Sequence, residues 1–187
     1  KNQESDVVLM TSMHKAKESG NPGVAAKPIP SKREAEILSN LGNAKLRKGD
    51  FESALGDYER VLAYAEEAEN KQLEGACHLC ISNCKQRLGR AEEALPHSRK
   101  ALVIEEERGD IQAIGCAYGD MGNVHEALGD YKRSLEFHLK HLKLAQDLED
   151  KEKEELVETS ISRVMEKLEA EARKRRENAY DENERLA

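Results

Sequence analysis

The sequence predicts an all-α protein built from three helix–turn–helix repeats followed by a capping helix. Its first support is a motif that recurs every 40 residues, with copies at Leu41-Gly42-Asn43, Ile81-Ser82-Asn83 and Met121-Gly122-Asn123. A second motif keeps the same interval, with copies at Gly49-Asp50-Phe51, Gly89-Arg90-Ala91 and Gly129-Asp130-Tyr131. The third support is the spacing of apolar residues around these motifs, which suits one buried face on each helix. A fixed period of this size indicates stacked repeats that share a thin core.

Composition narrows the classes of function. The chain has 187 residues, of which 36% are charged and 4% aromatic, and its net charge is -7. This charge argues against general nucleic-acid binding, which needs a clustered basic surface. No apolar run approaches the roughly 20 residues of a membrane span, and Val7–Met10 is too short for a signal peptide. We therefore expect a cytoplasmic protein without membrane insertion. Because the sequence begins at Lys1 rather than at Met, we also expect a fragment of a longer protein.

Residues 1–31 form a separate N-terminal segment. Within it, residues 5–19 predict a short helix with Ser5 as N-cap, and a Pro- and Gly-rich linker follows. This helix is tethered closely enough to fold back on the array, so self-association or autoinhibition by residues 5–19 is one prediction. Ser31 and Glu34 then form a capping-box pattern that starts the first array helix near Lys32.

The period sets the helices of the three repeats, which span residues 32–70, 71–110 and 111–150. First helices are predicted at 32–48, 71–88 and 111–128, and second helices at 51–68, 91–108 and 131–148. A glycine in the left-handed conformation closes each first helix. Pro96 lies near the first turn of its helix, where we expect it to be tolerated with a local distortion. The buried face of the first helices is predicted at Ile37, Leu38, Leu41, Ala44, Cys77, Ile81, Cys84, Leu88, Ala117, Met121, Val124 and Leu128.

A last helix is predicted from about Lys151. Its apolar stripe at Val157, Ile161, Val164 and Leu168 suits a capping helix over residues 151–172, which covers the end of the array. Residues 173–187 are predicted to be a charged helical extension. We interpret Arg173–Arg176 within it as a solvated stretch with charge pairs one turn apart rather than a nuclear signal or a nucleic-acid patch.

The sequence shows no catalytic constellation. Cys77, Cys80 and Cys84 share one helix face and are interpreted as small buried residues. The histidines at 78, 125 and 138 fall at packing positions, and no nucleophile or acid partner recurs with them. We therefore predict no enzyme activity, no catalytic residue, no bound metal and no cofactor.

The motifs carry a family resemblance. A Leu-Gly pair, then Gly-Asp-aromatic and then Ala-Leu resembles the tetratricopeptide repeat. The 40-residue form is similar to the Pins/LGN group of G-protein-signalling modulators, and less closely to Tonsoku-like and kinesin-light-chain repeats. The match is strongest over residues 118–146 and covers about 33–162, with departures at Ser82 and at Gly89-Arg90-Ala91. The additional repeats and Gα-binding motifs of Pins/LGN proteins are not visible. The resemblance implies a right-handed superhelical solenoid whose first helices line a concave groove.

Two sets of groove positions are candidates for peptide binding. Counted from Ala35, Gly75 and Gly115 as first positions, the ninth position of each repeat is Asn. In similar repeats such an asparagine ladder grips the backbone of a bound peptide. The alternative is that these amides bond only to neighbouring helices. Arg47 and Arg87 add a basic strip that suits an acidic peptide and is predicted to end at the third repeat, which has Glu126 and Ala127 instead. The predicted peptide-binding residues are Asn43, Asn83, Asn123, Arg47, Arg87, Ser39, Leu79 and Gln86.

These observations predict a non-enzymatic scaffold or adaptor that binds an extended, acidic protein segment in its groove. The alternative is a structural subunit of a cytoskeletal or ciliary assembly, which would use its convex face and its C-terminal helix.

Overall fold

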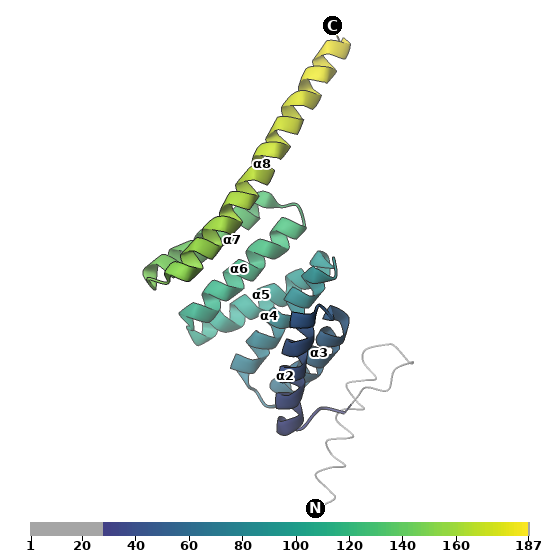
Figure 1. The fold of residues 1–187 in the computed structure, drawn as a ribbon, viewed down its shortest axis with the longest axis vertical. Coiled ribbons are helices and arrows are strands. Elements are labelled where there is room, and N and C mark those ends of the chain that lie inside the picture. Colours follow the sequence, from purple (N-terminus) through teal and green to yellow (C-terminus); the bar gives the residue numbers. More distant parts are fainter. Residues whose placement is uncertain (1–27, 187) are drawn as a thin grey trace, which may run out of the picture.

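The computed structural model describes residues 28–186, with side chains up to Ala179. This part of the chain folds into seven α-helices and contains no strand. The helices are α2 (Lys32–Lys48), α3 (Phe51–Glu67), α4 (Lys71–Arg87), α5 (Ala91–Arg108), α6 (Ile111–Ala127), α7 (Tyr131–Asp147) and α8 (Lys151–Leu186). Each helix packs against the next in an open stack (Figure 1). The predicted helix at 5–19 lies outside the described residues.

The helices begin and end within one residue of the predicted bounds, and the turns explain why. Gly49, Gly89 and Gly129 have φ values of +83°, +74° and +77°, so each adopts the left-handed conformation that closes a helix. The following Asp50 and Asp130 cap the next helices, because their carboxylates accept the backbone N–H groups of Ser53 and Arg133.

The start of α2 departs from the expected capping box. Ser31 caps α2 by accepting the N–H of Glu34 at 3.3 Å, but the Glu34 carboxylate pairs with Arg60 at 2.5 Å. The side chain that would complete the capping box therefore ties α2 to α3 instead. Helix α5 runs through Pro96 without interruption, so the proline is tolerated as predicted.

The core is a thin layer between successive helix pairs. Its best-packed part joins the first pair to the second and consists of Ala54, Leu55, Tyr58, Ile81 and Cys84, all 5% exposed or less. His78, His125 and His138 are 1–3% exposed, which confirms that they occupy packing positions. Cys77 and Cys84 are buried and Cys80 is half-buried, so this cysteine face packs inward as predicted.

The predicted buried face of α2 is partly wrong. Ile37 and Leu41 are 58% and 44% exposed, although the equivalent Cys77 and Ile81 of α4 are 3% and 0% exposed. These repeat positions pack against the preceding helix pair, and no described helix precedes α2. The sequence pattern identifies the face correctly, but burial depends on a neighbour that the pattern does not show.

Close approach of α6 and α7 depends on small residues. An added Cβ at Gly122 would lie 2.6–2.8 Å from ring atoms of His138, and His141 lies against Gly115 and Gly119 in the same way. Each imidazole fills the space that a side chain on α6 would need. Helix α7 can therefore place its imidazole rings against the glycines of α6, which have no side chain to occupy that space.

Gly122→Ala is expected to destabilise the array by about 1–3 kcal/mol, because the buried ring of His138 must move to admit the methyl group. Gly56→Ala is the matched control, since Gly56 is also helical but has nothing within 4 Å of an added Cβ. That control should gain about 0.5–1 kcal/mol from helix propensity. Denaturant unfolding measures both values, and equal effects of the two substitutions would contradict this packing.

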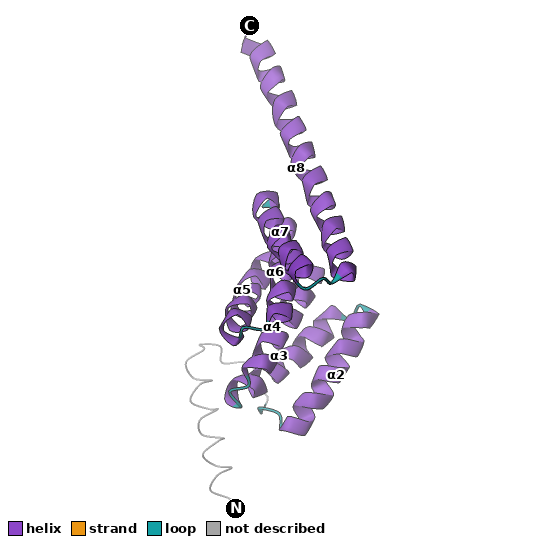
Figure 2. Cartoon of the chain, turned by 90° about the vertical axis from the view of Figure 1, so that its left-hand side faces the viewer, coloured by secondary structure: helices purple, strands orange, loops and turns teal. Residues whose placement is uncertain are grey.

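Helix α8 has two different halves. Val157 and Val164 are 2% and 0% exposed, and this half of α8 packs on α7. The remainder continues well past the other helices (Figure 1, Figure 2). In the described part of the chain, no helix combines the length and apolar character that a membrane span requires.

Candidate functional site

The predicted peptide-binding residues lie on α2, α4 and α6, the first helices of the three pairs. None of these side chains is fully buried. Asn43, Asn123, Arg47 and Arg87 are exposed, whereas Ser39, Leu79, Asn83 and Gln86 are half-buried. Each of these side chains is therefore at least partly reachable from solvent.

The three asparagines are not equivalent. The Asn43 side-chain oxygen accepts the Tyr58 hydroxyl at 2.7 Å, so its acceptor is already engaged within the first pair. The positions that correspond to Tyr58 are Ser98 and His138. Among the described residues, Asn83 and Asn123 have no hydrogen-bond partner, so both amides keep donor and acceptor free.

Gln86 belongs to an internal polar network. Its Nε2 donates to Asp120 Oδ1 at 2.6 Å and to Ser82 Oγ at 3.1 Å. Ser98 Oγ donates to the other carboxylate oxygen of Asp120 at 2.6 Å. Burial raises the pKa of Asp120, although these hydrogen bonds oppose the rise. The network joins α4, α5 and α6, and it engages the Nε2 atom of Gln86 inside the protein.

The basic residues of the first two pairs divide into paired and unpaired groups. Lys45 forms an ion pair with Asp57 at 2.6 Å, and Lys85 forms one with Glu93 at 2.7 Å. By contrast, Arg47 and Arg87 make no ion pair with any described residue. The Arg87 guanidinium lies 5.8 Å from the centre of the Phe51 ring, which holds it in place without neutralising it.

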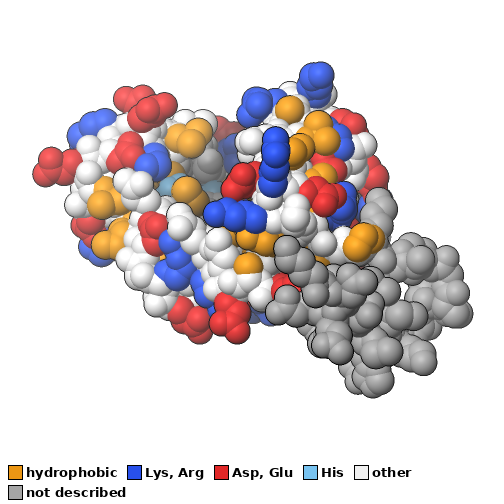
Figure 3. Space-filling model, turned by 90° about the horizontal axis from the view of Figure 1, so that it is seen from below, with side chains coloured by type: hydrophobic (Ala, Val, Ile, Leu, Met, Phe, Trp, Pro, Cys, Tyr) orange, Lys and Arg blue, Asp and Glu red, His pale blue; other side chains and the backbone are white. Residues whose placement is uncertain are grey.

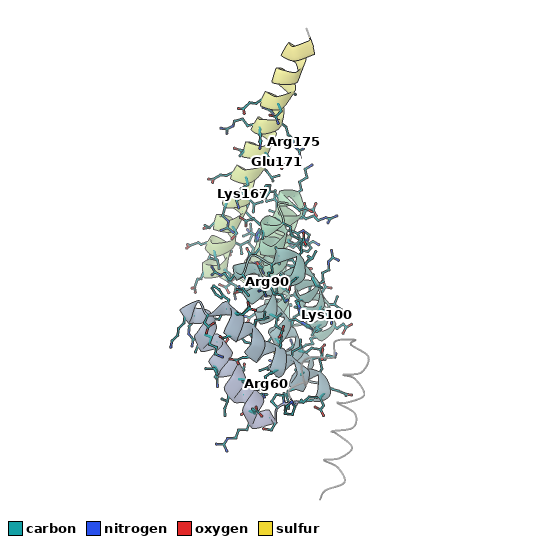
Figure 4. The ribbon with its side chains drawn as sticks, turned by 90° about the vertical axis from the view of Figure 1, so that its right-hand side faces the viewer. Arg60, Arg90, Lys100, Lys167, Glu171 and Arg175 are labelled. Atoms are coloured by element: carbon teal, nitrogen blue, oxygen red, sulfur yellow. The ribbon has the colours of Figure 1, made fainter. Side chains whose placement is uncertain are left out.

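Helix α8 contributes two basic residues that are not among the predicted peptide-binding residues. Arg163 donates from Nε and from a terminal nitrogen to the two carboxylate oxygens of Glu126, each at 2.9 Å, and Lys167 donates at 2.8 Å. Burial would raise the pKa of Glu126, but the two cations together lower it. Figure 4 shows Lys167 on the lower half of α8, with Glu171 and Arg175 closer to its end.

The register of the repeats could have found these residues. Arg163 and Lys167 follow Asn123 and Ala127 by 40 residues each, so they occupy the ninth and thirteenth positions of a fourth first helix. Beyond Glu126, where the basic strip was expected to end, two basic residues therefore recur on α8, and both are paired with Glu126. The carboxylate of Glu126 is neutralised by these two cations, and its side chain is only 10% exposed.

A hollow of about 270 Å³ opens between α2 and α4. Its lining combines polar and apolar groups: Lys32, Ala35, Glu36, Ser39, Asn40, Tyr64, Asn70 and Leu73. Ser39 is the predicted contact residue that the structure places here. On the face of the array seen from below, acidic and basic side chains are interspersed (Figure 3).

Comparison with known proteins assigns the family. Two overlapping segments, residues 33–107 and 74–147, match the family model described as Tetratricopeptide repeat. Together they cover more than half of the chain. The chain belongs to the tetratricopeptide repeat family. No curated protein matches the sequence.

Solved structures share this tetratricopeptide-repeat fold. The TPR domain of Arabidopsis FLU is 22% identical with a TM-score of 0.60, and the match covers 63% of this chain and 99% of that domain. Aspartyl phosphate phosphatase F from Bacillus subtilis is 21% identical with a TM-score of 0.59, and the match covers 76% of this chain but 41% of the phosphatase. At these identities the likeness concerns the fold alone.

The predicted tetratricopeptide-repeat fold is thus confirmed, and it indicates a protein–protein interaction module. The Pins/LGN subtype stays a prediction. So does the role of each groove residue, because the fold supplies the surface and the side chains decide what it binds.

Proposed function

We propose that this protein is a non-enzymatic adaptor that binds an extended, acidic segment of a partner protein along α2, α4, α6 and the first half of α8. The observation that supports it most is the combination of Asn83 and Asn123, whose amides are unused, with unpaired Arg47 and Arg87. An amide pairs with the N–H and C=O of an extended backbone together, and an arginine binds a carboxylate through two parallel hydrogen bonds.

The test uses selection from a random peptide library displayed on phage. We expect wild-type protein to enrich extended peptides rich in Asp and Glu. The double variant Asn83→Ala, Arg87→Ala should bind the enriched peptides at least tenfold more weakly, since it loses one backbone clamp and one charged contact. Binding should also weaken as salt is raised.

Lys100→Ala provides the matched control. It removes an exposed positive charge from α5, a second helix, and should leave peptide affinity unchanged. If the double variant binds as well as wild type, or if Lys100→Ala weakens binding as much, the groove assignment is wrong.

A second function has its own support in α8. The part of α8 beyond the stack has exposed side chains from Ala172 to Ala179, and a helix that leaves its domain can contact another subunit. We propose, as the alternative, a structural role in a cytoskeletal or ciliary assembly. Deleting residues 173–187 distinguishes the two functions, because it should preserve peptide binding and abolish assembly only if the alternative is correct.

A further inference from the structure

A cluster of metal-binding side chains lies where α3 ends and α4 begins. Ligand atoms of Glu66, Glu74 and His78 all lie within 4.8 Å of one another. Glu74 and His78 are one turn apart on α4, so they share a face of that helix, and Glu66 comes from the last turn of α3. The cluster therefore spans the junction between the first and second helix pairs.

His78 is the buried member of this cluster, and one of its ring nitrogens has no partner. Its side chain is 1% exposed, and its Nδ1 lies 3.0 Å from Nδ1 of His97 on α5. One of these two nitrogens must donate a proton to the other. The Nε2 atom of His78 is buried without a hydrogen-bond partner. If His78 is the donor at Nδ1, its Nε2 carries a free lone pair, which is the arrangement of a metal-bound histidine.

We propose that Glu66, Glu74 and His78 form a binding site for a divalent transition-metal ion, with zinc as the best match. Imidazole nitrogen and carboxylate oxygen are both ligand types that zinc accepts, and three of them leave the fourth position of a tetrahedral ion for water. Hard ions such as Mg²⁺ and Ca²⁺ prefer oxygen ligands alone. The repeat register places His78 at a packing position, which accounts for its burial but not for the carboxylates near it.

Binding requires only small rearrangements. Ligand atoms around a zinc ion lie about 3.4 Å apart, since zinc–ligand bonds are about 2.1 Å long, so the three side chains must move closer together. Glu66 is exposed and free to turn. Lys71 now pairs with Glu74 at 2.8 Å, and its ammonium group would have to move away. Lys71 is itself exposed at the helix start, so the rearrangement is local.

The ion would join α3 to α4 and hence the first helix pair to the second. Because a ligand that binds only the folded state stabilises it by mass action, added zinc should raise the melting temperature of the array. This effect does not involve the groove, so it can be tested separately from peptide binding.

The experiment must exclude the exposed thiol of Cys116, which can also bind zinc. We therefore use the full chain with Cys116→Ser and titrate it with Zn²⁺ by calorimetry and with Co²⁺ by visible absorption. One equivalent should bind, with a cobalt spectrum that lacks thiolate charge-transfer bands. Glu66→Gln should weaken binding tenfold or more and remove the zinc-dependent rise in melting temperature.

Glu67→Gln is the matched control, because Glu67 is the exposed neighbour of Glu66 outside the cluster. It should bind both ions like the Cys116→Ser parent. The proposal is overturned if that parent binds no metal, or if Glu66→Gln and Glu67→Gln bind it equally. Since Glu66 is exposed, loss of binding in its variant can be separated from unfolding by comparing the metal-free circular dichroism spectra.

Discussion

Tyr58→Ala is expected to lower the free energy of unfolding by about 3–5 kcal/mol, as typical for truncation of a large buried aromatic residue. Tyr58 is 2% exposed and packs in the cluster with Leu55, Ile81 and Cys84. Its ring also covers Gly42, where an added Cβ would lie 3.0 Å from it. The substitution therefore opens a cavity between the first and second helix pairs and removes the hydroxyl that bonds Asn43.

The loss should be local, because each pair in a solenoid contacts only its neighbours. Hydrogen-exchange mass spectrometry should show lost protection in α2, α3 and α4, with α6, α7 and α8 nearly unchanged. Tyr58→Phe is the control: it keeps the ring and loses only the hydrogen bond, at a cost of about 1 kcal/mol. Equal loss of protection in all helices would contradict the nearest-neighbour description.

Helix bounds were predictable because the signals for them are local. Gly129 followed by Asp130 ends one helix and caps the next within two residues, and the same chemistry recurs at Gly49-Asp50. The 40-residue period then predicts the same boundary in the other repeats. This holds even at the start of α5, where Arg90 provides no capping hydrogen bond. Tertiary structure adds little to such boundaries.

Contacts between helices were not predictable in the same way. The partner of Gln86 is Asp120, 34 residues away, and the partners of Glu126 lie on α8. A single helix pattern shows that Leu41 belongs to an apolar face but not whether another helix covers it. The three predicted asparagines illustrate the same limit. Only the structure shows that the Tyr58 hydroxyl donates a hydrogen bond to the side-chain oxygen of Asn43, and that Asn83 and Asn123 have no such partner among the described residues.

Acid is expected to destabilise the array through its buried histidines. Burial lowers the pKa of His125, His138 and His141 below the ordinary value of 6.5. Buried Nε2 atoms of His138 and His141 have no hydrogen-bond partner among the described residues, so nothing adjacent stabilises a proton there. Nearby charges act in both directions, because Glu126 favours the proton on His138 and Arg163 opposes it.

The sign follows from proton binding. Below pH 6.5 the unfolded chain binds protons that the folded chain does not yet accept, so stability is full above this pH and falls as the solution is acidified. At pH 5.5 the loss is at most about 1.4 kcal/mol per histidine, hence up to about 4 kcal/mol for these three. Burial raises the pKa of Asp120 and Glu105, which opposes the loss at lower pH.

Denaturant unfolding at pH 7.5 and 5.5 measures this difference. His138→Gln, which cannot titrate, should reduce the difference between the two pH values by up to about 1.4 kcal/mol, whatever its effect on stability at pH 7.5. His141→Gln should also reduce the difference in stability between the two pH values, which would independently show that buried histidines cause it. If both variants keep the full pH dependence of the parent, the acid sensitivity does not come from the rings that α7 packs against the glycines of α6.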